Sequence, residues 1–194
     1  EDLTVRLKKT GPQHRAKAAR LLGVRGDGAA AAPLRAAIAG EKNASALADE
    51  CAALVRCAGS DAAAEVVGVL GRLGVRGRVR VAEALAAAGV PEGFAELAAA
   101  LGEENRYVRF EAARALRRSG RGEAEKPLLE ALRDRCRWVR REAIAGLGRL
   151  GGSAATAPLE RIRKADRETD LRAEARWALE RIRSRASGGR RRHK

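Results

Sequence analysis

The sequence predicts an all-α fold, a right-handed α-solenoid of about six stacked units with two helices each. Three observations support this prediction. A helical segment recurs as RYVRFEAARAL (106–116), RWVRREAIAGL (137–147) and TDLRAEARWAL (169–179). A glycine closes each of five helical segments at intervals of 30 to 33 residues. Aromatic residues make up only 3% of a chain rich in alanine, leucine, arginine and glutamate, which favours closely packed helices.

The glycines that mark the repeat come first. They are Gly26, Gly59, Gly89, Gly120 and Gly151. Self-similarity at this period indicates stacked helical hairpins, because a single hairpin cannot bury its apolar stripe alone. No segment shows the alternation that is typical of a half-buried strand.

Each unit begins with a first helix. Its signal is clear in AAPLRAAI (31–38), EKPLLEAL (125–132) and TAPLERI (156–162), where a proline stands at a place that suits the first turn of a helix. The six units begin near Leu3, Pro33, Val66, Phe94, Pro127 and Pro158.

The second helices of the last three units share one apolar face at helical spacing. This predicted core face consists of Val108, Ala112, Ala115, Leu116, Val139, Ala143, Gly146, Leu147, Leu171, Ala175, Ala178 and Leu179. Alanine and glycine on this face allow neighbouring helices to approach closely.

An acid before the second helix, followed six positions later by an arginine, also recurs. The pairs are Glu103 with Arg109, Asp134 with Arg140, and Asp166 with Arg172. With this pattern the chain resembles HEAT repeats, in particular the short phycobilisome-lyase type. The resemblance covers essentially the whole chain and implies a ladder of acid–arginine pairs that ties one repeat to the next. The N-terminal half departs from it, with Ala48 at the arginine position and Lys9 and Arg72 at acid positions.

The charge is strongly positive but unevenly distributed. Of the formal net charge of +15, five charges lie in the tail SRASGGRRRHK (184–194), whereas residues 31–100 are close to neutral. We therefore expect a repeat array over residues 1–183 and a basic, disordered tail over 184–194. The excess of arginine indicates a partner with negative charge.

The concave side of such a superhelix is usually lined by the second helices and is the usual binding surface. Positions expected to face outward there include Asp49, Ala53, Ala86 and Gly148. The candidate partner-binding residues on this face are Arg20, Phe110, Arg114, Arg117, Arg141 and Trp177. An aromatic side chain beside guanidinium groups is enriched at protein interfaces and also stacks on bases. Trp177 has a second interpretation, as a cap over the exposed end of the core.

A further arginine column is expected at the C-terminal ends of three second helices. It consists of Arg118 and Arg149, which are candidate binding residues, followed by Arg181. The column would form a positive ridge for an acidic partner. Favourable interaction of each arginine with its helix dipole is the alternative explanation.

Catalytic and metal-binding patterns are missing from the sequence. The histidines are His14 and His193, and Cys51, Cys57 and Cys136 have no metal-ligand spacing. We therefore expect no enzyme activity, no cofactor and no metal. Sparse cysteines fit a reducing compartment, so a cytoplasmic location is expected, and no apolar run is long enough to span a membrane.

The sequence thus predicts a non-catalytic scaffold that recognises a protein partner with an acidic surface. Nucleic-acid binding is the second hypothesis, because the net charge favours backbone contacts and some HEAT-like proteins are DNA glycosylases for alkylated bases. The resemblance also allows the C-terminal repeat domain of a larger enzyme, or a lyase-type maturation factor. The chain contains no methionine, which fits a processed start or a piece of a longer protein.

Overall fold

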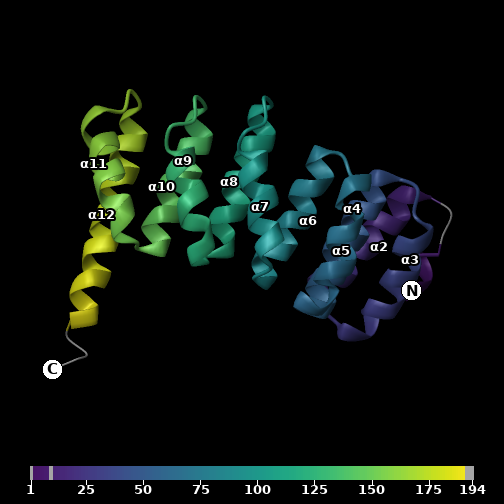
Figure 1. Cartoon of the computed structure of the whole chain (residues 1–194). Coiled ribbons are helices and arrows are strands. Elements are labelled where there is room, and N and C mark those ends of the chain that lie inside the picture. The colour runs from purple at the N-terminus through teal and green to yellow at the C-terminus, as the bar shows by residue number, and fades with distance from the viewer. Residues whose placement is uncertain (1, 9–10, 191–194) are drawn as a thin grey trace. The chain divides into compact units, whose positions relative to one another are not determined.

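The computed structural model describes residues 2–8 and 11–190, and no strand occurs in these ranges. Within these ranges six pairs of α-helices follow one another in sequence order (Figure 1). The first helices are α1 (Leu3–Arg6), α3 (Ala31–Gly40), α5 (Ala63–Val69), α7 (Pro91–Ala100), α9 (Glu125–Ala131) and α11 (Thr156–Ala165). The second helices are α2 (Pro12–Arg25), α4 (Ala44–Ala58), α6 (Val75–Ala88), α8 (Arg106–Ser119), α10 (Arg137–Leu150) and α12 (Thr169–Arg190). The predicted all-α fold of two-helix repeats is confirmed.

The chain divides into two compact units, Glu1–Ala100 and Leu101–Lys194. In unit 1, helix α4 packs against α2, α3 and α6, and α6 packs against α7. In unit 2, helix α10 packs against α8 and α12, while α9 contacts α8 and α10, and α11 contacts α12 (Figure 1). The boundary between the two units lies between α7 and α8, so it separates the two helices of the fourth pair.

The local signals of the repeat correspond to the observed helix ends. All five predicted glycines have positive φ, between 64° and 83°, a conformation that costs glycine little because it has no Cβ. Pro33, Pro127 and Pro158 each lie in the first turn of a first helix, as predicted.

The predicted core face is also confirmed. All twelve of its residues are buried. In unit 1 every residue from 46 to 55 of α4 is buried, because neighbouring helices cover this helix on all sides. The core of unit 1 combines aliphatic side chains with many alanines, which agrees with the composition.

Several positions expected to face outward are buried instead. Ala53 and Ala86 are 0% exposed, and Gly148 and Asp49 are buried as well. The reason is that second helices pack directly against each other through small residues. A Cβ added at Gly23 would lie only 2.9 Å from the Cα atom of Ala53. The surface that the second helices leave exposed to solvent is therefore much narrower than the sequence pattern suggests.

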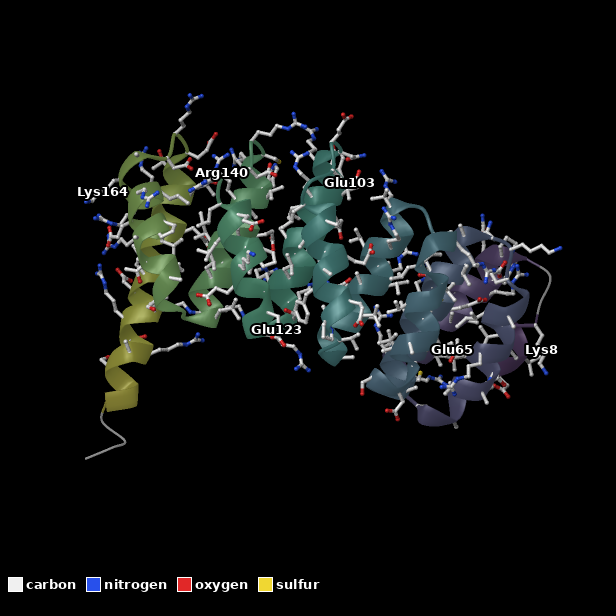
Figure 2. The ribbon with its side chains drawn as sticks, in the orientation of Figure 1. Lys8, Glu65, Glu103, Glu123, Arg140 and Lys164 are labelled. Atoms are coloured by element: carbon white, nitrogen blue, oxygen red, sulfur yellow. The ribbon has the colours of Figure 1, made fainter. Side chains whose placement is uncertain are left out.

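The predicted ladder is present in unit 2, where Figure 2 shows Glu103 and Arg140 at the same end of the helices. Arg109 donates from Nε to Asp134 Oδ2 at 2.7 Å and from Nη1 to the carbonyl oxygen of Glu103 at 2.8 Å. Arg140 donates to Asp166 at 3.1 Å and to the carbonyl oxygen of Asp134 at 3.0 Å. Each arginine thus binds the carboxylate of the following repeat and the backbone of its own.

Unit 1 has ladder contacts as well, although its sequence departs from the pattern. Arg15 donates from Nε to Glu41 Oε2 at 2.6 Å, and this hydrogen bond holds the pKa of Glu41 below its ordinary value. Arg72 donates to the carbonyl oxygen of Glu41 at 2.6 Å. Arg72 thereby makes the backbone contact that Ala48 cannot make. Lys9 lies outside the described residues.

The expected disordered tail is helical over residues 184–190, because α12 continues to Arg190. The hydroxyl groups of Ser184 and Ser187 donate to carbonyl oxygens one turn earlier. The Arg185 guanidinium donates to the carbonyl oxygen of Arg149 on α10, which ties this segment to unit 2. Residues 191–194, including His193, lie outside the described residues. None of the helices described is long and apolar enough to cross a membrane.

Candidate functional site

A groove of about 380 Å³ lies over the second helices of unit 2. Its lining combines small residues, one aromatic side chain, three arginines and one acid. The lining residues are Arg117, Ala145, Gly148, Arg149, Glu174, Trp177, Ala178 and Arg181. All of them come from α8, α10 and α12, the helices predicted to carry the binding face.

The floor of the groove is made of small residues. Ala145 and Gly148 belong to α10, and Ala178 belongs to α12. A Cβ added at Gly148 would lie 2.9 Å from the Cβ atom of Ala178 and 3.0 Å from its Cα atom. The two helices therefore approach so closely that no larger side chain fits between them, and the floor stays smooth.

Trp177 borders the groove with most of its surface in solvent. Its side chain is 68% exposed. A cap over the core would bury its indole ring, so this exposure argues against the cap interpretation. Exposed tryptophan is enriched among the residues that dominate binding at protein interfaces.

Arg149 and Arg181 bring positive charge to the same groove. Both residues are exposed, and neither guanidinium group has an acidic partner among the residues that the structure describes. The carbonyl oxygen of Arg149 is occupied by the Arg185 guanidinium. The side chains of Arg149 and Arg181 are therefore available for an external anion.

Arg117 lines the groove but already has a partner. It donates from Nε to Glu142 Oε2 at 2.5 Å, and both side chains are partly buried. This ion pair connects α8 with α10. Arg117 therefore serves as a link between repeats as well as a wall of the groove.

The predicted cluster of Phe110, Arg114 and Arg141 lies outside the groove lining. The guanidinium carbon of Arg114 lies 5.7 Å from the centroid of the Phe110 ring, and Arg114 also forms an ion pair with Glu111. Arg141 is exposed and has no ion pair within residues 2–8 and 11–190. The structure thus brings Arg117, rather than the whole cluster, to the groove.

The remaining two candidates lie elsewhere. Arg20 belongs to unit 1 and pairs with Asp49 at 3.1 Å, a carboxylate that Arg80 also contacts at 2.8 Å. Asp49 is only 1% exposed, which explains why it needs both cations. Arg118 is exposed on α8 and does not line the groove.

Sequence reasoning missed two exposed aromatic residues at the start of second helices. Tyr107 is 60% exposed and Trp138 is 48% exposed. The guanidinium carbon of Arg106 lies 5.0 Å from the centroid of the Tyr107 ring, and that of Arg137 lies 4.6 Å from the Trp138 ring. The signal was present in the sequence, because both aromatic residues follow an arginine at the same position of the repeat.

A second hollow of about 440 Å³ lies between the first helices α9 and α11. Lys126, Glu130, Arg133 and Arg161 line it together with apolar side chains. Its lining contains no aromatic residue, so it offers less contact surface for a ligand than the groove beside Trp177.

Cysteines and other possible metal ligands occur in the part of the chain that the structure describes. No group of three or more His, Cys, Asp or Glu side chains there could hold a metal ion. The three cysteines are free thiols, and burial raises the pKa of Cys51 to about 12. Cys51 is therefore a protonated core residue at neutral pH.

The stacked two-helix repeats and the arginine ladder define the class of the molecule, an α-solenoid repeat protein. Residues 94–180 match the family described as HEAT repeats. This match confirms the predicted resemblance to HEAT repeats, while the phycobilisome-lyase type of repeat stays a prediction. No curated protein matches the sequence.

Several solved structures share this fold. An engineered protein has 20% sequence identity and a TM-score of 0.53, with 94% of this chain and 95% of that chain covered. A designed armadillo repeat protein in complex with the peptide (KR)4 has 17% identity and a TM-score of 0.55, with 93% and 98% covered. Human deoxyhypusine hydroxylase in complex with glycerol has 22% identity and a TM-score of 0.52, with 94% and 73% covered. At these identities the similarity concerns the fold alone.

Proposed function

We propose that this protein is a non-catalytic scaffold that binds an acidic segment of a protein partner in the groove between α10 and α12. The observation that carries the proposal is the pair Arg149 and Arg181, two exposed arginines in one groove. Neither side chain has an acidic partner in the described ranges, and Trp177 lies beside them.

The chemistry of these side chains suits a peptide with carboxylate groups. A guanidinium group binds a carboxylate through two parallel hydrogen bonds, which supplies both energy and orientation. The indole ring of Trp177 offers a large apolar surface for a neighbouring side chain of the peptide. The smooth floor of Ala145, Gly148 and Ala178 allows a peptide backbone to approach closely.

A structural neighbour supports the peptide class of ligand. The designed armadillo repeat protein is described in complex with a basic peptide, (KR)4. The arginines without acidic partners in the present groove have the opposite preference, so we infer an acidic segment rather than a basic one.

Fluorescence anisotropy with short labelled peptides tests this proposal. A peptide of glutamate and leucine is expected to bind, and the same peptide with lysine in place of glutamate is not. Replacing Arg149 and Arg181 together by serine is expected to weaken binding of the acidic peptide by about 100-fold, since hydrogen bonds to charged groups contribute about 1.5 kcal/mol or more each. Arg76→Ser with Arg167→Ser is the matched control, because both residues are exposed outside the groove lining. Equal losses in both double variants would show that only the net charge matters.

A further inference from the structure

The groove contains an acid as well as arginines, and this acid has no internal partner. Glu174 lines the groove, and it makes no hydrogen bond or ion pair with any residue that the structure describes. An acid of this kind disfavours a purely acidic ligand. It therefore indicates a second chemical requirement of the partner.

The preceding repeat shows how such an acid is normally satisfied. Glu142 is the sixth residue of α10, and Glu174 is the sixth residue of α12. Glu142 accepts a hydrogen bond from Arg117, the twelfth residue of α8, at 2.5 Å. The twelfth residue of α10 is Gly148, so the arginine that would pair with Glu174 is missing from the chain.

An internal side chain cannot take this place. A Cβ at Gly148 would lie 2.9 Å from the Cβ atom of Ala178, closer than packed side chains allow. The close approach of α10 and α12 thus requires glycine at the position where the repeat pattern puts a cation. The same glycine leaves open the part of the groove that an arginine of the preceding repeat would fill.

Trp177 provides a second contact for a cation at this place. A guanidinium or ammonium group binds the face of tryptophan better than that of any other aromatic side chain. Arg137 makes this contact with Trp138 elsewhere in unit 2, at 4.6 Å from the ring centroid. The exposed indole ring of Trp177 and the carboxylate of Glu174 line the same groove.

We propose that Glu174 and Trp177 receive an arginine or lysine side chain of the partner, which takes the place that Arg117 occupies beside Glu142. The inference rests on the proposed function, in which Arg149 and Arg181 bind an acidic group of the same segment. The partner segment therefore carries both a basic and an acidic residue. Glu174 and the two arginines together determine the order in which the basic and the acidic residue of the segment lie along the groove.

The test measures fluorescence anisotropy with the whole protein and a series of labelled peptides. Each peptide consists of glutamate and leucine and contains one arginine, and the spacer between the arginine and the glutamates increases in length along the series. In the reference peptides citrulline replaces arginine, which keeps the shape and removes the charge. We expect the best arginine peptide to bind about tenfold more tightly than its citrulline counterpart, the effect of an exposed ion pair combined with a cation–π contact. Glu174→Gln should remove this difference and leave the citrulline peptide unchanged.

Glu180→Gln is the matched control, because Glu180 lies on the same helix, is exposed and is absent from the groove lining. It should leave the preference for arginine intact. If Glu174→Gln instead tightens binding of both peptides, Glu174 is only a repulsive charge, and the inference is wrong while the proposed function stands. Equal binding of the arginine and citrulline peptides to the unchanged protein would also overturn the inference and leave the proposed function standing. If neither peptide binds, both proposals are overturned.

Discussion

The Arg109 guanidinium lies 2.7 Å from the carboxylate of Asp134 in the next repeat, and both side chains are less than 10% exposed. The same guanidinium donates to the carbonyl oxygens of Glu103 and Glu104, so its hydrogen-bonding groups are used on both sides. The pairing with Asp134 raises the pKa of Arg109, which keeps the cation charged. This arginine joins two hairpins that would otherwise meet mainly through small apolar residues.

Arg109→Ala is expected to destabilise the protein by about 3–5 kcal/mol, because it leaves the Asp134 carboxylate nearly buried without its cation. The measurement is urea unfolding followed by circular dichroism. Arg35→Ala is the control, since Arg35 and Glu65 form an ion pair with 44% and 39% of their side chains exposed. The control should change the free energy of unfolding by less than about 1 kcal/mol. Similar losses in the two variants would show that burial does not decide the contribution of this ladder.

Arg140→Ala separates stability from binding. Its pair with Asp166 is somewhat more exposed, at 15% and 10%, so the loss of stability should be smaller than for Arg109→Ala. Affinity for the acidic peptide should stay within about twofold of the unchanged protein, because Arg140 does not line the groove. The melting temperature and the peptide titration are measured on the same sample. Loss of peptide binding without a change in melting would contradict the structural role.

Glycine has two different roles in unit 1 helices. A Cβ at Gly93 would lie 2.5 Å from the backbone nitrogen of Ala86, so Gly93→Ala must push α7 away from α6. We expect a loss of about 2 kcal/mol or more. Gly68 in α5 has no atom within 4 Å of such a Cβ, so Gly68→Ala should stabilise the protein by about 0.5–1 kcal/mol. Thermal unfolding of both variants checks this, and destabilisation by Gly68→Ala would contradict the open space around α5.

The elements of the fold were predictable because their signals are local. A glycine with positive φ ends a helix through its own backbone, and a proline fits the first helical turn whatever lies around it. The core face followed from helical periodicity, which depends on one helix at a time. The ladder of Arg109 and Arg140 was implied by the resemblance to HEAT repeats, which rests on an acid and an arginine six residues apart in each repeat.

The candidate site was only partly predictable because it depends on contacts between repeats. Arg114 and Arg117 look alike in sequence, yet Arg114 pairs within its own helix and Arg117 pairs with Glu142 on the next one. The groove arises where Gly148 stands in α10 at the position that Arg117 has in α8, so the pairing of an arginine with the next helix is interrupted. A single glycine in a helix gives no signal of a groove in the sequence. The ladder contact of Arg15 was missed for a similar reason, since its partner Glu41 stands one position away from the expected acid.

Binding to nucleic acid is expected to be weak and nonspecific. On the second helices of unit 2, Arg114 and Arg117 are already paired with acids, and five of the net positive charges lie in residues 184–194, so the net charge of +15 is not gathered in one channel. Labelled single-stranded and duplex oligonucleotides should bind at low salt and be released at near-physiological salt, because released counterions drive such binding. Removing residues 191–194, which carry three positive charges, should weaken the low-salt complex. Tight binding that survives physiological salt without these residues would favour the nucleic-acid hypothesis instead.

Glu50 on α4 is buried in the core of unit 1 without a hydrogen-bond partner. It is 0% exposed, and both its carboxylate oxygens are unsatisfied within the described residues. Burial raises the pKa of Glu50 to about 7, the charges of Glu41 and Asp49 add to this effect, and Arg15 opposes it. In the folded protein the Glu50 carboxyl group therefore stays protonated up to about pH 7. In the unfolded chain it loses its proton near its ordinary pKa of 4.5.

The sign of the pH dependence follows from this preference. A group with a raised pKa in the folded state contributes stability that is fully present below its unfolded pKa and is lost as the pH rises through its folded pKa. Stability of unit 1 should thus fall between about pH 4.5 and about pH 7, by about 3 kcal/mol in total, since one pKa unit corresponds to about 1.4 kcal/mol. The pKa of Glu41 is lowered, so its contribution is lost only at lower pH.

Glu50→Gln should abolish this dependence, because the amide resembles the protonated acid and does not ionise. Urea unfolding at a series of pH values on both proteins provides the measurement. The difference in free energy of unfolding between variant and unchanged protein should grow in favour of the variant as the pH rises towards about 7 and level off above it. A difference that is constant over this range would mean that Glu50 keeps its ordinary pKa, and that a contact to its carboxylate forms in solution.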